Sequence, residues 1–356
     1  MISEFYKDRK VLVTGHTGFK GSWLTLWLLK MGANVFGLSK SLPTEPSLYQ
    51  KLNLQSQVKN FNSDITDREE IISVFDQVKP DVVFHLAAQP IVSMSYQDPV
   101  QTFMINGMGT AHILDALREL KHLCSVIVVT SDKCYQEHNN LWGYRESDPL
   151  GGKDPYSASK SIAEHIAYSY THSFFMNEGS NVRLATGRAG NVIGGGDWSK
   201  DRIVPDCMNA WYQKLPMRLR SPKAIRPWQH VLDAVNGYLM LGCQLAQQES
   251  LNGEAFNFGP PISNDLDVQT LVEGLAKAYG SRDAYEVVDN SVKESHYLRL
   301  NSEKSIKLLN WYPKLDFQGA VSYTASWYKA YHTEPDSIIE YTDQQLSEFI
   351  ERSHDM

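Results

Sequence analysis

The sequence has few cysteines, no excess of basic residues and no long apolar run. Its four cysteines, Cys124, Cys134, Cys207 and Cys243, contain no Cys-x-x-Cys pair, which argues against a zinc site or a disulfide framework. Its 41 Asp and Glu outnumber its 34 Lys and Arg, and the net charge of -7 argues against binding to nucleic acid or to a membrane surface. No apolar run reaches the roughly 18 residues of a membrane span, and residues 1–10 lack the apolar core of a signal peptide. These absences predict a soluble cytoplasmic protein with reduced thiols.

Short β-branched runs alternate with helical stretches through the first half of the 356 residues. Strands are predicted at residues 10–14, 34–38, 58–63, 81–87, 125–130 and 182–186. Helices are predicted at 19–31 and from a capping box of Thr66 and Glu69 to residue 78. The alternation predicts an α/β fold with a doubly wound parallel sheet of the Rossmann type.

Glycine clusters and prolines interrupt this regularity after Gly187. Such a segment is typical of loops and small helices over the carboxyl edge of a sheet, where ligands bind. We therefore expect a Rossmann domain that carries the catalytic residues at 1–187 and a smaller, mixed substrate-binding region at 188–335. Residues 336–356 are expected to be a tail, either a packed helix or partly free.

A glycine-rich stretch, GHTGFKG at residues 15–21, follows the first strand and opens a helix. Glycines there let the backbone turn sharply and approach a pyrophosphate at the positive end of the helix, which predicts a dinucleotide cofactor. The acid expected at the end of the second strand is replaced by Ser39 and Lys40, and Lys40 could favour a 2′-phosphate, so NAD and NADP both stay open. Asp64, after the third strand, could accept from the adenine amino group or be a turn aspartate.

Tyr156 and Lys160 stand four residues apart, on one face of a predicted helix. A neighbouring cation lowers the pKa of a phenol, which is about 10 when unperturbed, and makes the phenolate a usable base near neutrality. Asp154 and Pro155 indicate the start of this helix, and Ser131 follows the fifth strand at the same edge of the sheet. These residues predict a hydroxyl, a base and a cation that remove a proton from an alcohol as its hydride leaves.

Several motifs together resemble the extended short-chain dehydrogenase/reductases that act on nucleotide sugars, the NAD-dependent epimerase/dehydratase family. They are the glycine stretch, HLAA at 85–88, Asn106 with Gly109 and Thr110, TSD at 130–132, YSASK at 156–160, and Arg188 with NVIG at 191–194. The stretches GHTGFKG, TSDKCY at 130–135, GGGDW at 194–198 and IRPWQH at 225–230 resemble more narrowly the 4,6-dehydratases of this family. The resemblance extends from about residue 5 to residue 330.

The resemblance implies a hydro-lyase that converts CDP-D-glucose to CDP-4-dehydro-6-deoxy-D-glucose, a step in deoxysugar biosynthesis of the O-antigen type. Tyr156 would take the proton of the C4 hydroxyl with help from Ser131 and Lys160, while C4 gives its hydride to NAD. Water would then leave across C5 and C6 with Asp132 as the acid, and the hydride would return to C6. Related dehydratases commonly carry a glutamate base after this aspartate; Lys133 stands here, as an unusual base or as an orienting group.

The resemblance also assigns contacts to the cofactor and the substrate. Expected cofactor contacts are Gly15, His16, Thr17, Gly18, Phe19, Lys20, Gly21, Ser39, Asp64, Ile65, Leu86, Ala87, Ala88, Asn106, Tyr156 and Lys160. Expected substrate contacts are Gln89, Ser131, Asn191, Arg226 and Tyr297, with Arg226 favoured for the diphosphate. No metal is expected, because the 11 histidines form no His-x-x-x-His or similar cluster.

Two long helices predicted at 100–116 and 157–174 could expose apolar faces. Family members commonly dimerise through a four-helix bundle of this kind, which implies a homodimer or a homotetramer; the alternative is an intramolecular core.

Three other functions stay open at this point. A nucleotide-sugar 4-epimerase would share the tyrosine, the lysine and the cofactor loop, but would not need the acid and base at 132–133. A dehydratase for another nucleotide-glucose would differ only in base specificity, which no residue dictates physically. A non-catalytic NAD-binding scaffold is disfavoured by the intact set of Ser131, Tyr156 and Lys160.

Overall fold

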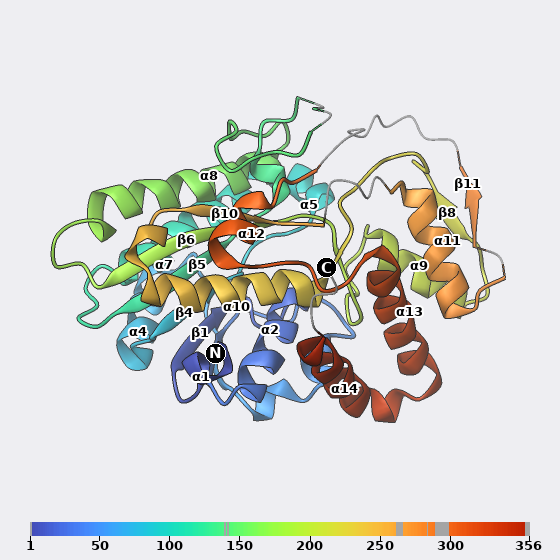
Figure 1. Ribbon diagram of the computed structural model, residues 1–356, viewed down its shortest axis with the longest axis horizontal. Coiled ribbons are helices and arrows are strands. Elements are labelled where there is room, and N and C mark those ends of the chain that lie inside the picture. The colour runs from blue at the N-terminus through green and yellow to red at the C-terminus, as the bar shows by residue number, and fades with distance from the viewer. Residues whose placement is uncertain are drawn as a thin grey trace.

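A seven-stranded parallel sheet forms the centre of the protein (Figure 1). The computed structural model describes residues 2–138, 140, 142–260, 266–282, 284–288 and 299–352. The strands are β1 (Lys10–Thr14), β2 (Asn34–Leu38), β3 (Lys59–Phe61), β4 (Val82–His85), β5 (Cys124–Val129), β6 (Val182–Ala189) and β10 (Ala255–Phe258). Their order, β10-β6-β5-β4-β1-β2-β3, reverses between β1 and β4, which is where α/β sheets of this kind open a crevice for ligands.

Helices cover both faces of the sheet (Figure 1). Successive side chains of a strand point to opposite faces, so Val11 and Val13 of β1 join one core cluster and Leu12 joins the other. The first face carries α1 (Ile2–Tyr6), α2 (Phe19–Lys30) and α10 (Val231–Gln247). The second face carries α4 (Arg68–Val78), α7 (Gly109–Ala116) and α8 (Pro155–Tyr170), with α5 (Val92–Gln97), α6 (Pro99–Phe103) and the π-helical turns η2 (Met104–Met108) and η4 (Thr171–Phe175) beside them.

A second group of elements lies at one side of the sheet, at the right of Figure 1. It contains α9 (Ile203–Tyr212), α11 (Val268–Tyr279), α13 (Phe317–Thr333) and the parallel pair β8 (Met217–Leu219) and β11 (Tyr285–Val287). The pair β7 (Val192–Ile193) and β9 (Gln229–His230) leads into it from the end of β6. The remaining elements are α3 (Leu48–Lys51), α12 (Glu303–Leu309), α14 (Ile338–Glu351) and the short 3-10 turns η1 (Leu54–Ser56), η3 (Asp132–Cys134), η5 (Glu249–Leu251) and η6 (Pro335–Ser337).

The parallel α/β fold and all six predicted strands are confirmed, with ends that shift by a few residues. The predicted capping box at Thr66 is wrong in detail. Asp67 caps α4 instead, accepting from the amides of Glu69 and Glu70 at 3.1 Å each, while the Thr66 hydroxyl donates to Asp64 at 2.8 Å. Thr66 and Asp67 are both suitable N-cap residues, and either can reach the free amides of the first turn, so the sequence alone does not decide between them.

The expectation of loops and small helices after Gly187 is wrong for α10 and α13, which have 17 residues each. β10 also returns to the sheet beside β6, so both halves of the chain build it. The prolines that suggested interruption lie mostly in the connections, and Pro205 lies in the first turn of α9, where proline is tolerated. The tail contains α14, whose Phe349 is fully buried and packs edge-on against Trp27. The domain boundary at Gly187 stays a prediction.

None of the described helices has the length and apolar character needed to cross a bilayer.

The packing of α10 on the sheet predicts a large stability cost for Leu239→Ala. Leu239 is fully buried, and its carbonyl accepts from the Tyr6 hydroxyl of α1 at 2.8 Å. The cavity left by the substitution is expected to lower the free energy of unfolding by about 3 kcal/mol in equilibrium urea titrations. Leu308→Ala, at a side chain that is 46% exposed, serves as the control and is expected to cost under about 1 kcal/mol. Equal costs for both variants would contradict this account of the core.

Candidate active site

A cavity of about 640 Å³ lies over the carboxyl ends of the strands, where the strand order reverses. Its lining comes from the β1–α2 connection, from the segments that follow β2 to β6, from the first turns of α8, and from Asp197 and residues 199–205, among others. All strands of the sheet are parallel, so side chains that follow different strands meet at this one edge. The cavity therefore draws on both halves of the chain.

The glycine stretch packs too closely for other residues. Gly15 has a φ of +73°, and a Cβ there would lie 2.7 Å from the backbone nitrogen of Ala87. A Cβ on Gly21 would collide with the carbonyl oxygen of Gly15. The N-cap residue of α2, Gly18, has no side chain to cap the helix, which leaves the first amides of α2 for an anionic ligand. Except for His16, residues 15–21 all line the cavity, and the arrangement fits the pyrophosphate of a dinucleotide.

His16 turns away from the cavity lining. Its Nε2 lies 2.8 Å from Asn60 Oδ1 and its Nδ1 lies 3.1 Å from Ser39 Oγ. Its ring occupies the space beside Gly37, where any side chain would collide with it. Burial lowers the pKa of His16, so the ring is neutral near pH 7. Its contact with Ser39 places that hydroxyl at the end of β2, among the residues that line the cavity.

Lys40 is paired with Asp64. The Lys40 ammonium donates to Asp64 Oδ2 at 2.7 Å, and the other oxygen of Asp64 accepts from the amide and the hydroxyl of Thr66 at 3.0 and 2.8 Å. A 2′-phosphate would have to compete with this carboxylate for the lysine. Ser39, Lys40 and Asp64 all line the same end of the cavity.

The predicted hydroxyl, base and cation line one cavity. Asp154 caps α8 by accepting from the amide of Ser157 at 2.9 Å, and the helix carries Tyr156 in its first turn and Lys160 in its second. Burial lowers the pKa of Lys160 to about 8. The pKa of Tyr156 is raised, because burial outweighs the opposing effects of the Ser131 hydroxyl and the Arg202 guanidinium. The sequence predicts that Lys160 lowers the pKa of the Tyr156 phenol. In the structure that pKa is raised instead, because desolvation is the larger effect.

Asp132 and Lys133 differ sharply in their surroundings. Asp132 is 2% exposed; its Oδ1 accepts from the Ser131 hydroxyl at 2.9 Å, and its Oδ2 has no hydrogen-bond partner among the described residues. Oδ2 lies over Gly190, where a Cβ would collide with it. Lys133 is partly exposed, and its ammonium donates to Glu137 Oε1 at 2.6 Å.

The charged residues of the cavity lining include Lys20, Lys160, Arg202, Asp132 and Asp197. The pKa of Lys20 is lowered to about 7 by burial, then by Arg202 and Lys160, against the opposing effects of the two carboxylates. Arg202 lies 3.6 Å from Asp197 in an ion pair. The sequence prediction missed Gly190, Asp197 and Arg202. Asp197 lay within the GGGDW stretch and Gly190 beside Asn191, but nothing in the pattern of residues pointed to Arg202.

Several predicted contacts do not line the cavity. Asn106 is buried; its amide donates to Ser159 Oγ at 2.8 Å, and its oxygen accepts from the backbone of Gln89 at 2.8 Å. The Gln89 side chain bonds to Thr102 and to the amide of Ile91, so both residues brace the connection after β4. Arg226 also lies outside the lining, and its Nη1 donates to the Ile225 carbonyl at 2.9 Å.

The other predicted substrate contacts, and the tryptophans of the GGGDW and IRPWQH stretches, have different outcomes. Asn191 lines the cavity, with a positive φ of 45°. Trp228 also lines it, and its indole nitrogen has no hydrogen-bond partner among the described residues. Trp198 instead packs against Trp327 and Tyr331, with ring centroids 5.7 and 5.2 Å away. Tyr297 lies outside the described residues. The remaining predicted cofactor contacts, Ile65, Leu86, Ala87 and Ala88, all line the cavity.

Solved structures of sugar-nucleotide enzymes have the same fold. A dTDP-glucose 4,6-dehydratase from Bacillus anthracis in complex with NAD aligns with a TM-score of 0.76 at 20% identity, over 92% of this chain and 97% of that one. A UDP-glucose 4-epimerase from Thermus thermophilus in complex with NAD aligns with a TM-score of 0.75 at 24% identity, over 90% and 98% of the two chains.

The sequence comparisons are more specific. The family model described as GDP-mannose 4,6 dehydratase matches residues 12–324. A CDP-glucose 4,6-dehydratase of Salmonella typhimurium is 41% identical over 340 residues, which cover 94% of each chain. A CDP-paratose 2-epimerase of Salmonella typhi is 25% identical over 352 residues. The chain thus belongs to the GDP-mannose 4,6-dehydratase family, within the extended short-chain dehydrogenase/reductases.

Proposed function

We propose that the protein dehydrates CDP-D-glucose to CDP-4-dehydro-6-deoxy-D-glucose with NAD as cofactor, a step in deoxysugar biosynthesis. The observation that carries this proposal is the 41% identity to a CDP-glucose 4,6-dehydratase over 94% of both chains. The cavity supports it, because Asp132 lies beside Ser131, Tyr156 and Lys160 in its lining. A 4-epimerase has no leaving hydroxyl to protonate and therefore no use for this acid.

For the cofactor, Gly15 and residues 17–21 would hold the pyrophosphate, and Ser39 and Asp64 would contact the adenosine end. The pairing of Lys40 with Asp64 at 2.7 Å supports NAD over NADP, because a 2′-phosphate would meet the Asp64 carboxylate beside the lysine. When bound, NAD supplies the acceptor and donor of the hydride and a positive ring that stabilises a nearby phenolate.

In the proposed reaction the chain moves three protons. Tyr156 takes the proton of the C4 hydroxyl as the C4 hydride departs, while the ammonium of Lys160 stabilises the phenolate and Ser131 donates to the sugar oxygen. The C4 ketone makes the C5 proton acidic. Asp132 then protonates the C6 hydroxyl, which leaves as water when a base takes the C5 proton. Hydride return to C6 and reprotonation at C5 complete the cycle.

Product analysis tests this function. Incubated separately with CDP-, dTDP-, GDP- and UDP-glucose, the protein is expected to produce the alkali-sensitive 4-keto chromophore only from the cytidine substrate. Tyr156→Phe is expected to lower kcat by about 10³-fold, because it removes the base. Formation of CDP-galactose without the chromophore would identify an epimerase, and turnover confined to another nucleotide would overturn the substrate.

Lys133 requires a test of its own, because an ammonium bonded to Glu137 must leave that ion pair and lose a proton before it can act as a base. Lys133→Met is expected to block elimination after C4 oxidation, so reduced cofactor accumulates at 340 nm and kcat falls by about 10²-fold or more. Lys133→Arg retains the charge but cannot serve as a base. A block shared by both variants indicates a base, recovery in the arginine variant indicates an orienting group, and normal turnover of Lys133→Met excludes both roles.

We propose a homodimer that forms through α6, η2 and α8. Val100, Met104 and Met108, four residues apart, are 71%, 40% and 44% exposed, and Ile162 and Tyr168 of α8 are 37% and 63% exposed. Apolar side chains at this spacing form a stripe suited to pairing with a second copy.

We also propose a cytoplasmic location, which is supported by four buried free thiols that suit a reducing compartment.

The dimer predicts that Met104→Glu, which places a charge in the stripe, produces a monomer in sedimentation-velocity experiments at micromolar concentration. Leu308→Glu, at a partly exposed side chain outside the stripe, is expected to leave the assembly unchanged. A wild-type protein that sediments as a monomer would refute the proposal, and a tetramer that Met104→Glu converts to a different dimer would indicate two interfaces.

A further inference from the structure

We propose that the buried pair of Glu164 and Arg188 is a positioning device that holds the Ser131–Lys133 loop in register with Tyr156 and Lys160. The inference rests on the proposed dehydratase function. It concerns two residues that do not line the cavity and that the reaction itself does not use.

Glu164 continues the series of functional residues on α8. It follows Lys160 by four residues, as Lys160 follows Tyr156, so all three lie along one face of the helix. Glu164 is 4% exposed, and both of its oxygens are occupied by hydrogen-bond donors. Oε1 accepts from Thr130 Oγ1 and from Arg188 Nε at 2.9 Å, and Oε2 accepts from Thr186 Oγ1 at 2.9 Å and from Arg188 Nη2 at 2.8 Å. Such a saturated carboxylate fixes the helix relative to the ends of β5 and β6.

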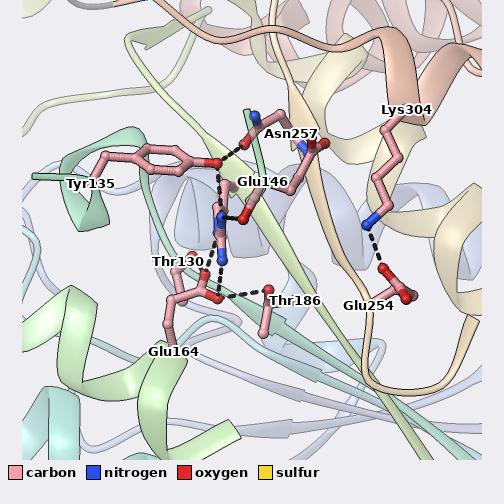
Figure 2. Close-up of polar contacts among 9 residues, drawn as sticks. Thr130, Tyr135, Glu146, Glu164, Thr186, Glu254, Asn257 and Lys304 are labelled. Carbon is pink, nitrogen blue, oxygen red and sulfur yellow. Dashed lines mark hydrogen bonds and ion pairs between the residues drawn. The ribbon is translucent and has the colours of Figure 1, made fainter. Parts of the chain in front are cut away.

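Arg188 carries the connection to the other end of the loop. Its Nη1 donates to the hydroxyl of Tyr135 at 2.7 Å and to the Glu146 carbonyl at 3.2 Å, and its guanidinium lies 4.9 Å from the centre of the Tyr135 ring. Figure 2 shows Tyr135 pointing to Asn257, whose Oδ1 accepts from the phenol at 2.7 Å. Asn257 belongs to β10, so the network also ties the loop to the last strand of the sheet.

The loop is therefore held at both ends by the same pair. Thr130 immediately precedes Ser131 and bonds directly to Glu164, and Tyr135 follows the η3 turn and bonds to Arg188. Tyr156 and Lys160 share a rigid helix with Glu164. A displacement of the pair would move the acid and the hydroxyl relative to the base, and misplacements of about 1 Å can cost about 100-fold in rate.

The pair also has an electrostatic effect on Lys160. Burial is the largest influence and lowers the pKa of Lys160 to about 8, while the Glu164 carboxylate is among the groups that raise it. Among the described residues, the titratable groups that interact with Lys160 include Lys20 of α2, His85 of β4, Cys134 of η3 and Glu164 of α8. Loss of the Glu164 charge leaves the Arg188 guanidinium uncompensated, and both changes disfavour the ammonium. Lys160 then loses its proton at a lower pH.

The test compares Glu164→Gln with wild type and with Glu254→Gln. Glu254 pairs with Lys304 at 2.5 Å, also drawn in Figure 2, but touches neither the loop nor α8 through that pair. Glu164→Gln is expected to lower kcat by about 30-fold with KM changed by less than about 3-fold, because geometry and not binding is altered. The alkaline limb of the pH–kcat profile is expected to move at least half a unit toward acid. Glu254→Gln is expected to match wild type in both respects.

Glu164→Asp separates charge from geometry. The aspartate restores the negative charge but shortens the reach, so the alkaline limb is expected to return to its wild-type position while kcat stays low. A merely structural role predicts lower thermal stability with no movement of the limb. A kcat and a limb in Glu164→Gln equal to those of wild type would overturn the proposal.

Two measurements keep the inference independent of folding defects and of the substrate. If Glu164→Gln does not fold, Tyr135→Phe serves in its place, because it removes only the phenol oxygen between Arg188 and Asn257. A kcat lowered by about 5-fold at constant KM supports the proposal, and an unchanged kcat refutes it.

Titration of the Lys160 ε-carbon by ¹³C NMR, assigned with Lys160→Met, requires no sugar nucleotide. A lower titration midpoint in Glu164→Gln, with a wild-type midpoint in Glu164→Asp, supports the electrostatic part, even if wild type fails to convert CDP-glucose and the proposed function is wrong; an unchanged midpoint in Glu164→Gln contradicts it.

Discussion

Everything in this protein depends on seven strands that run in one direction. Parallel strands require a crossover after each strand, so helices cover both faces and all the connections that follow the strands open on a single edge. The order reverses between β1 and β4, and the crossovers on either side of that point diverge and leave the cavity between them. The glycine turn after β1, the Ser131 loop after β5 and the segment after β6 are thereby brought together although they are far apart in the chain.

Local patterns were sufficient where the chemistry is local. The glycine stretch needs only a strand before it and a helix after it, and Tyr156 and Lys160 need only one helix, so both could be predicted from spacing and lie where expected. The six strands follow from runs of β-branched residues. Likewise, the resemblance of motifs in their order along the chain was enough to indicate the family, which the comparisons confirm.

What the sequence could not supply was contact between distant segments. The need for glycine at position 190 exists only because Asp132, 58 positions earlier in the printed sequence, folds over it. Asn106 and Gln89 are expected contacts from the resemblance, but neither lines the cavity. The Asn106 side chain bonds to the backbone of Gln89, and the Gln89 side chain bonds to Thr102 and to the amide of Ile91. His16 was expected among the cofactor contacts because it lies in the glycine stretch, yet the space left by Gly37 on the neighbouring strand accepts its ring. The sequence pattern does not predict the 17-residue α10, because the nearby prolines indicate interruptions although they lie outside the helix.

The buried charges of the site divide into two kinds, and the division follows from desolvation. A carboxylate taken out of water is costly unless hydrogen bonds replace its hydration. Glu164 has four such bonds, two of them from the Arg188 guanidinium, and those interactions hold its pKa below the usual range although burial, the largest single effect, acts to raise it. Asp132 is equally buried, but one of its oxygens has no partner among the described residues. Groups left unsatisfied in a cavity are the ones that a ligand can complete, while satisfied ones make the frame rigid. In the proposed reaction, the saturated pair would provide the fixed reference against which the unsatisfied Asp132 is aligned, and both would be needed to deliver a proton to one hydroxyl of the sugar.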